Sequence, residues 1–266
     1  MKLRWIANYG PAFVLTVTLL VLWELYVRSG QISATVLPTP TSIVLALANN
    51  WDVISVQTLQ TLVETVLGLA AATLVGLLLA ILLDVSPAMR RAVYPLLVTS
   101  QTIPIIALAP LVLIWFGYDL GPKVLVVALY CFFPIAVACA DGLLGTDPDL
   151  ERLMRSMRAS RWQILQLVRL PGAMPAFFSG LRIAATYSMT GAIFAEYVGA
   201  YQGLGIYMEN SANAHAVVLV FAAILVTAAL SLLLFGLVSV IERIALPWYQ
   251  GAQVRAFGDA GMRRMG

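Results

Sequence analysis

The stretch DLERLMRSMRASRWQILQLVRLP (Asp149–Pro171) carries five of the sixteen Lys and Arg residues in a chain of 266 residues. The chain as a whole is 61% hydrophobic and 11% charged, whereas soluble domains are about a quarter charged. A spanning helix needs about 20 mostly apolar residues, so the uncharged runs around this stretch predict an integral membrane protein. Long runs without Asp, Glu, Lys or Arg include Trp5–Trp23, Thr65–Leu83, Ala92–Tyr118, Val124–Ala140 and Asn210–Ile241.

Six spanning helices fit the chain and predict an all-α membrane protein with a single transmembrane domain over residues 1–266. The basic start and the apolar run after it also fit a signal peptide. No small-x-small cleavage pattern follows them, so we expect a first membrane helix. A short interfacial helix is expected near Ser42–Asn49. The expected spans are about 11–27, 59–83, 93–117, 123–140, 176–197 and 216–241, with the Arg-rich segment at about 147–171.

The basic residues are distributed unequally between the two sides that these spans define. Two of them, Arg28 and Lys123, fall on one side, and Arg182 near a helix end is left unassigned. The positive-inside rule therefore predicts that both termini and the Arg-rich segment are cytoplasmic. Membrane topology explains the positions of the arginines better than nucleic-acid binding does, because they lie in short segments between apolar runs. The thirteen residues of the basic side are Lys2, Arg4, Arg90, Arg91, Arg152, Arg155, Arg158, Arg161, Arg169, Arg243, Arg255, Arg263 and Arg264.

The Arg-rich segment itself has an apolar face of helical period, from Leu150 to Val168. The letters RAS at 158–160 interrupt this period and predict a bend between two short helices. The residues alone leave two interpretations open. The segment is either an amphipathic helix whose arginines contact anionic lipid, or a docking surface for a soluble partner.

A longer pattern narrows this choice. RSMRASRWQILQLVRLPGAMPAFFSGLRIAATYSMTGAIFAEYVGA (155–200) resembles the Glu-Ala-Ala loop region of ABC importer permeases. That pattern is Glu-Ala-Ala, three residues, Gly, nine residues and Ile-x-Leu-Pro. Alignment on Leu170–Pro171 places its glutamate at Arg152, its glycine at Arg158 and its isoleucine at Val168. Either Glu151 replaces the missing carboxylate, or the partner cleft is more acidic than usual.

Further matches in the same order cover most of the chain, from about residue 37 to residue 249. LPTPTSI, SQTIPIIALAPLVLIWFGYDLGPK, CFFPI and YQGLGIYM resemble the permeases that import nitrate, sulfonates, pyrimidine precursors of thiamine, and riboflavin. The form LMRSMRASRWQI is most similar to the pyrimidine-precursor and riboflavin members. The substrate expected from this resemblance is one of those two, with taurine, other sulfonates or nitrate as alternatives.

The resemblance implies the type I ABC importer fold and a set of partners. These are a second copy of the chain, two cytoplasmic ATPase subunits, an extracytoplasmic solute-binding protein, and the lipid of a bacterial inner membrane. The Arg-rich segment would be the coupling helix that docks on an ATPase, and the outward loop Tyr201–Asn213 would meet the binding protein. The expected docking residues are Glu151, Arg155, Ser156, Met157, Arg158, Ala159, Ser160, Arg161 and Trp162.

No catalytic chemistry is expected of the chain. It lacks the phosphate-binding pattern G-x-x-x-x-G-K-[ST], so ATP and Mg²⁺ would bind the partner ATPase and the chain would bind no cofactor. The sole histidine, His215, has no Cys or His cluster nearby, so no metal site is expected. Eight residues of helix separate Cys131 from Cys139 by about 12 Å, which is too far for a disulfide. Both are therefore expected to be packing residues.

Polar residues inside the expected spans are candidates for a solute pathway. Proline-broken polar helix in a membrane must face protein or water, although hydroxylated residues also serve helix packing. Buried carboxylates in a membrane are costly and point to function. They also support a rival class, an ion-coupled secondary transporter that uses Glu64 and Glu196. The pathway candidates are Glu64, Gln101, Thr102, Tyr187, Thr190 and Glu196.

Overall fold

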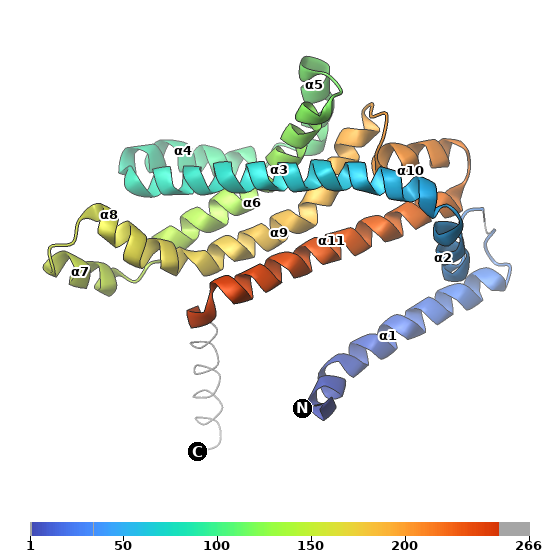
Figure 1. Cartoon of the computed structure of the whole chain (residues 1–266), viewed down its shortest axis with the longest axis horizontal. Helices are drawn as coiled ribbons and strands as arrows, with labels where there is room; N and C mark the ends of the chain where they lie inside the picture. The colour runs from blue at the N-terminus through green and yellow to red at the C-terminus, as the bar shows by residue number, and fades with distance from the viewer. Residues whose placement is uncertain (1, 34, 250–266) are drawn as a thin grey trace.

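The computed structural model describes residues 2–33 and 35–249, and every regular element in these ranges is a helix (Figure 1). The all-α fold class is therefore confirmed, and a short helix, α2, is present where an interfacial helix was expected. The elements are α1 (Lys2–Arg28), α2 (Pro40–Asn49), α3 (Trp51–Val85), α4 (Pro87–Ser100), α5 (Ile105–Phe116), α6 (Leu120–Leu144), α7 (Pro148–Ser156), α8 (Arg161–Ile164), the π-helical turn η1 (Leu165–Arg169), α9 (Leu170–Tyr197), α10 (Leu204–Asn213) and α11 (Val217–Ala245).

Five helical segments in the described ranges are long and apolar enough to cross a membrane. They correspond to the first, second, fourth, fifth and sixth expected spans. The fifth reaches further back along the chain than expected, because α8, η1 and α9 follow one another without a break. The five segments are Gly10–Arg28, Trp51–Val85, Leu120–Leu144, Arg161–Tyr197 and Val217–Ala245.

The expected third span, 93–117, differs from the prediction of one continuous helix. It is split into α4 and α5, which are bent by 99° relative to each other. Pro104 lies at the break; it has no backbone N–H and disfavours helical conformation in the residue before it. The hydroxyl of Thr102 donates to the carbonyl of Thr99 at 2.7 Å and so satisfies one group of the broken turn.

Small residues let the central helices α3, α6 and α9 approach closely, as is usual in membrane helix packing. Gly68 of α3 lies against Val127 of α6, where an added Cβ would overlap the valine side chain. Gly180 of α9 lies so near α6 that a Cβ would be 2.5 Å from the carbonyl oxygen of Pro134. Neither glycine can carry a side chain without separating the helices.

The long helices α3, α6, α9 and α11 lie side by side, and α1 runs apart from them beyond α2 (Figure 1). The two ends of the molecule carry different elements. The Arg-rich end, as we call it, holds α7 and α8, and the opposite end holds α2 and α10. The apolar side chains of α1 from Phe13 to Leu22 are mostly exposed, which suits a helix surrounded by lipid.

Candidate functional site

At the Arg-rich end, α7 and α8 form two short helices joined by a tight turn, which confirms the expected bend. The turn is closed by the amide of Ala159, which donates to the carbonyl of Met154 at 3.0 Å. Arg158 stands in the turn with a left-handed backbone, φ 61°. Ser160 then begins α8 with a capping box: its hydroxyl accepts from the amide of Gln163, whose side chain accepts from the amide of Ser160.

The side chains around this turn form an exposed surface that is both apolar and basic. Met157 is 70% and Trp162 is 58% exposed. The side chain of Arg155 is 68% exposed, and Arg158 and Arg161 are exposed as well. Behind the turn, a cleft of about 610 Å³ extends between α8 and the junction of α3 with α4. Exposed aromatic and arginine side chains of this kind are typical anchors in protein interfaces.

Glu151 does not belong to that exposed surface, although it was expected among the docking residues. Its carboxylate accepts two hydrogen bonds from Arg169, at 2.7 Å from Nε and 2.9 Å from Nη2. Arg169 also donates to Asp84 at the end of α3, at 2.7 Å. Glu151 therefore joins α7 to the start of α9 and the end of α3. The hydrogen bonds from Arg169 hold the pKa of the Glu151 carboxyl group below its ordinary value, against the opposing effect of burial.

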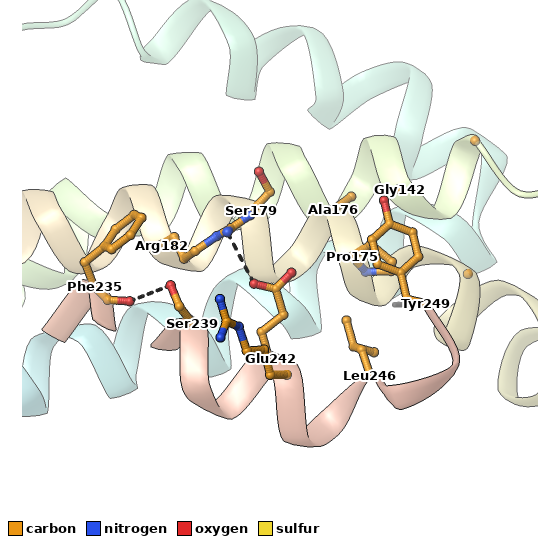
Figure 2. A pocket seen from close by; sticks show the side chains of 13 residues that line it. Gly142, Pro175, Ala176, Ser179, Arg182, Phe235, Ser239, Glu242, Leu246 and Tyr249 are labelled. Atoms are coloured by element: carbon orange, nitrogen blue, oxygen red, sulfur yellow. Dashed lines mark hydrogen bonds and ion pairs between the residues drawn. The ribbon is translucent and has the colours of Figure 1, made fainter. Parts of the chain in front are cut away.

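A cavity of about 1170 Å³ opens beside α9 and α11 towards the Arg-rich end. Figure 2 shows Arg182 of α9 and Glu242 of α11 reaching towards each other across it; their Nη1 and Oε2 atoms lie 3.5 Å apart. Ser179 and Ser239 also line the cavity. Its wall is thus polar and charged, in a part of the chain that is otherwise strongly apolar.

The open face of α9 continues beyond this cavity. Ile183, Thr186, Tyr187 and Thr190 are exposed at helical spacing, and Tyr187 is 48% exposed. The expected pathway residues Tyr187 and Thr190 therefore share one face of one helix. Gln101 and Thr102 are exposed too, in the bend between α4 and α5.

The two expected pathway carboxylates, Glu64 and Glu196, lie elsewhere: both are fully buried at the opposite end. The Glu196 carboxylate accepts from the hydroxyl of Thr61 at 2.7 Å and from the backbone amide of Gly205 at 2.5 Å. The amide of Leu204 donates to the Thr61 hydroxyl at 2.8 Å. Burial and hydrogen bonding separate these carboxylates from the open face of α9.

Glu64 is held by a different set of partners. Lys123 of α6 donates to it at 3.1 Å and Gln60 donates at 2.9 Å, both to Oε1. Its other oxygen, Oε2, is buried without a hydrogen-bond partner in the structure. Lys123 was expected on the outward-facing side; it lies with Glu64 at the end opposite the Arg-rich end, where it is 5% exposed and forms an ion pair inside the helix bundle.

Sequence reasoning missed three residues of this buried cluster: Gln57, Thr61 and Gly203. The amide of Gly203 donates to the side chain of Gln57 at 2.7 Å. A signal was available, because Gln57, Thr61 and Glu64 recur at four- and three-residue spacing and so share one face of α3. Within the described residues, no group of three or more His, Cys, Asp or Glu could hold a metal ion.

Known sequences with similar patterns are transport proteins. Residues 72–245 match the family model of the binding-protein-dependent transport system inner membrane component. The formylaminopyrimidine transport permease protein ThiX of Halalkalibacterium halodurans is 39% identical over 86% of this chain and 92% of its own. The riboflavin transport system permease protein RibX of Chloroflexus aurantiacus is 34% identical over 60% of each chain.

Among solved structures, inward-facing conformations of the MetNI methionine ABC transporter contain a chain of similar fold. The TM-score is 0.62 at 19% sequence identity, and the match covers 72% of this chain and 95% of that one. At this identity the likeness concerns the fold alone. It agrees with the helix arrangement described above.

Proposed function

Because this chain belongs to the family of binding-protein-dependent transport system inner membrane components, and is thus the permease component of an ABC importer, we propose that it carries a thiamine pyrimidine precursor or riboflavin. Hydrolysis of ATP takes place on a separate subunit, and the chain is a multi-pass inner membrane protein. Membership of this family contradicts the alternative of an ion-coupled secondary transporter.

The observation that carries the substrate proposal is the 39% identity to the formylaminopyrimidine permease over nearly the whole chain. The riboflavin permease supports the same class of heterocyclic solute. The taurine permease TauC of Escherichia coli is 32% identical over 72% of this chain, which keeps a sulfonate as the second candidate. Nitrate is the remaining alternative.

The surface proposed to dock on the ATPase is the α7–α8 turn. Met157 and Trp162 offer apolar anchors, and Arg155, Arg158 and Arg161 surround them with positive charge. Such a surface suits a cleft with an apolar floor and acidic rim. ATP and Mg²⁺ would bind the ATPase alone. Glu151 contributes indirectly, because its bonds to Arg169 fix α7 against α3 and α9.

The proposed pathway runs between two copies of the chain along the open face of α9. Thr186, Tyr187 and Thr190 are polar or hydroxylated and exposed in the single chain. In lipid such groups are costly, whereas a second copy and a water-filled path would satisfy them. The cavity with Arg182 and Glu242 would then be the cytoplasmic mouth of this path, with both termini on the cytoplasmic side.

Ligand-stimulated ATP hydrolysis in proteoliposomes tests the substrate proposal. The permease is reconstituted with its ATPase and binding-protein partners and supplied with formylaminopyrimidine, riboflavin, taurine or nitrate. Stimulation and uptake with formylaminopyrimidine or riboflavin are expected. Stimulation by taurine or nitrate alone would contradict the proposed substrate and identify that solute as the substrate.

A further inference from the structure

The first turn of α10 is bound by side chains of two other helices. The backbone amides of Gly203, Leu204 and Gly205 donate, in that order, to Gln57, Thr61 and Glu196, over 2.7, 2.8 and 2.5 Å. The first amides of any helix lack partners within the helix. Here α3 and α9 supply all three acceptors, and no side-chain cap of α10 itself is present.

Glu196 is the centre of this arrangement. Its carboxylate faces the start of α10, where the helix dipole favours negative charge, and Thr61 donates to its other oxygen. The side chains of Thr61 and Glu196 are fully buried, so these hydrogen bonds act where water does not compete while the end is closed.

The glycines show that this contact is a close one. Gly203 has φ 133°, a conformation that favours glycine, and a Cβ there would overlap the Glu196 carboxyl group. A Cβ on Gly205 would lie 2.6 Å from the carbonyl oxygen of Ile193. Both positions must lack a side chain for the amides to reach their acceptors.

The same glycines supply a hinge. Gly199 and Gly203, with φ 146° and 133°, bracket a short link between α9 and α10, and Tyr201 in that link is 92% exposed. Glycine adopts many backbone conformations at little cost. Water that enters on opening would hydrate the three amides and their acceptors, so the net free energy lost with each hydrogen bond is small.

We propose that Gln57, Thr61 and Glu196 form a latch that closes the outer end of the permease, and that α10 leaves α3 when this end opens to receive solute. The proposal rests on the proposed transport function. Glu64 and Lys123 are outside the latch: they join α3 to α6 and make no hydrogen bond to α10 among those described.

A thiol at position 204 would report the opening of the latch. The side chain of Leu204 is fully buried, whereas its amide, which makes the latch bond, is kept in Leu204→Cys. The native thiols of Cys131 and Cys139 are fully buried. The rate of labelling by a membrane-impermeant methanethiosulfonate is measured in proteoliposomes that contain the ATPase and the binding protein, at rest and after trapping with ATP and vanadate.

The resting transporter is expected to label slowly and the trapped one rapidly. Glu196→Gln replaces an acceptor oxygen by a donor amide and Thr61→Ala removes one acceptor, so each should speed resting labelling, about tenfold for one lost hydrogen bond. Gly236→Ala, whose added Cβ meets nothing within 4 Å, should leave the rate unchanged.

Two results would overturn the latch. One is the absence of labelling at position 204 in the trapped transporter. This measurement uses Leu204→Cys alone, without a change at Gln57, Thr61 or Glu196. The other is equal acceleration by Gly236→Ala and Glu196→Gln. Assembly with the ATPase is checked for each variant, and Thr61→Ala replaces Glu196→Gln if the latter does not assemble. If ATP hydrolysis is stimulated but labelling is not, the latch alone fails; if no ATPase binds, the proposed function fails.

Discussion

Among single residues, Arg158 shows why the family pattern has glycine at this position. The pattern has glycine at this position, and Arg158 adopts a left-handed backbone, φ 61°. That conformation costs an ordinary residue roughly 1 kcal/mol and glycine almost nothing. We expect Arg158→Gly to stabilise the α7–α8 turn, so that the Ala159 amide exchanges hydrogen about fivefold more slowly. Faster exchange in this variant than in the unmodified chain would contradict the assignment of strain.

The same position separates conformation from charge in docking. Arg158→Glu reverses the charge of an exposed side chain, so we expect loss of stimulated ATP hydrolysis with normal membrane insertion. Arg158→Gly should retain more of the stimulation, because it keeps the turn. Arg91→Glu, an exposed charge reversal on α4, is the matched control. Full stimulation in Arg158→Glu would remove this residue from the docking surface.

Lys123 shows where reasoning from single residues stops. Its expected place on the outward-facing side agrees with its position at the end opposite the Arg-rich end, but the positive-inside rule counts positions and does not identify partners. Its partner Glu64 is 59 residues earlier on another helix. Met157 and Trp162 were expected at a docking surface from the family resemblance, and the structure leaves both side chains exposed. The pairing of buried charges depends on tertiary contacts and was not predicted.

Among the elements, α7 depends on the ion pairs of Arg169 for its position. The pKa of Glu151 is lowered by hydrogen bonds from Arg169. Its contribution to stability is therefore complete above the ordinary pKa of about 4.3 and is lost as pH falls through the lowered value. We expect Glu151→Gln to lower the thermal unfolding midpoint at pH 7 and to flatten its acid dependence. The cost is about 1–3 kcal/mol.

Arg152→Gln is the control for that experiment. Arg152 and Asp149 form an ion pair whose side chains are 80% and 83% exposed, and exposed pairs contribute little. The thermal unfolding midpoint of this variant should match that of the unmodified chain at pH 7 and at acid pH. An equal loss in both variants would mean that general charge, and not the bonds to Arg169, sets the position of α7.

The helix α4 and its neighbour α5 mark the limit of what apolar length predicts. The first, second, fourth and sixth spans could be located from uncharged runs, because each of these runs contains one long helix. In the third, Pro95, Pro104 and Pro110 were visible, yet the 99° bend falls at only one of them. Helices tolerate a proline when neighbouring groups satisfy the freed carbonyl, so the sequence of one element does not decide where it breaks.

For the whole molecule, the exposed polar face of α9 allows the proposed assembly of two copies to be tested. Identical residues near a two-fold axis approach each other across the interface. We therefore expect Thr190→Cys to form a covalent dimer under mild oxidation in membranes, because Thr190 lies on the exposed polar face of α9. Leu232→Cys should not, because Leu232 is an apolar residue of α11, 72% exposed and suited to lipid. Both variants retain the buried native thiols, so neither has an advantage from Cys131 or Cys139.

The extent of cross-linking then separates an interface from random collision. An interface gives a yield that stays constant when the protein is diluted in lipid, and solute or ATP with vanadate should change it as the path opens. Collision gives equal yields for both variants, falling on dilution. That second pattern would mean that this face of α9 lies against lipid, where the Thr186 hydroxyl is satisfied by its hydrogen bond to the carbonyl of Arg182 at 3.2 Å.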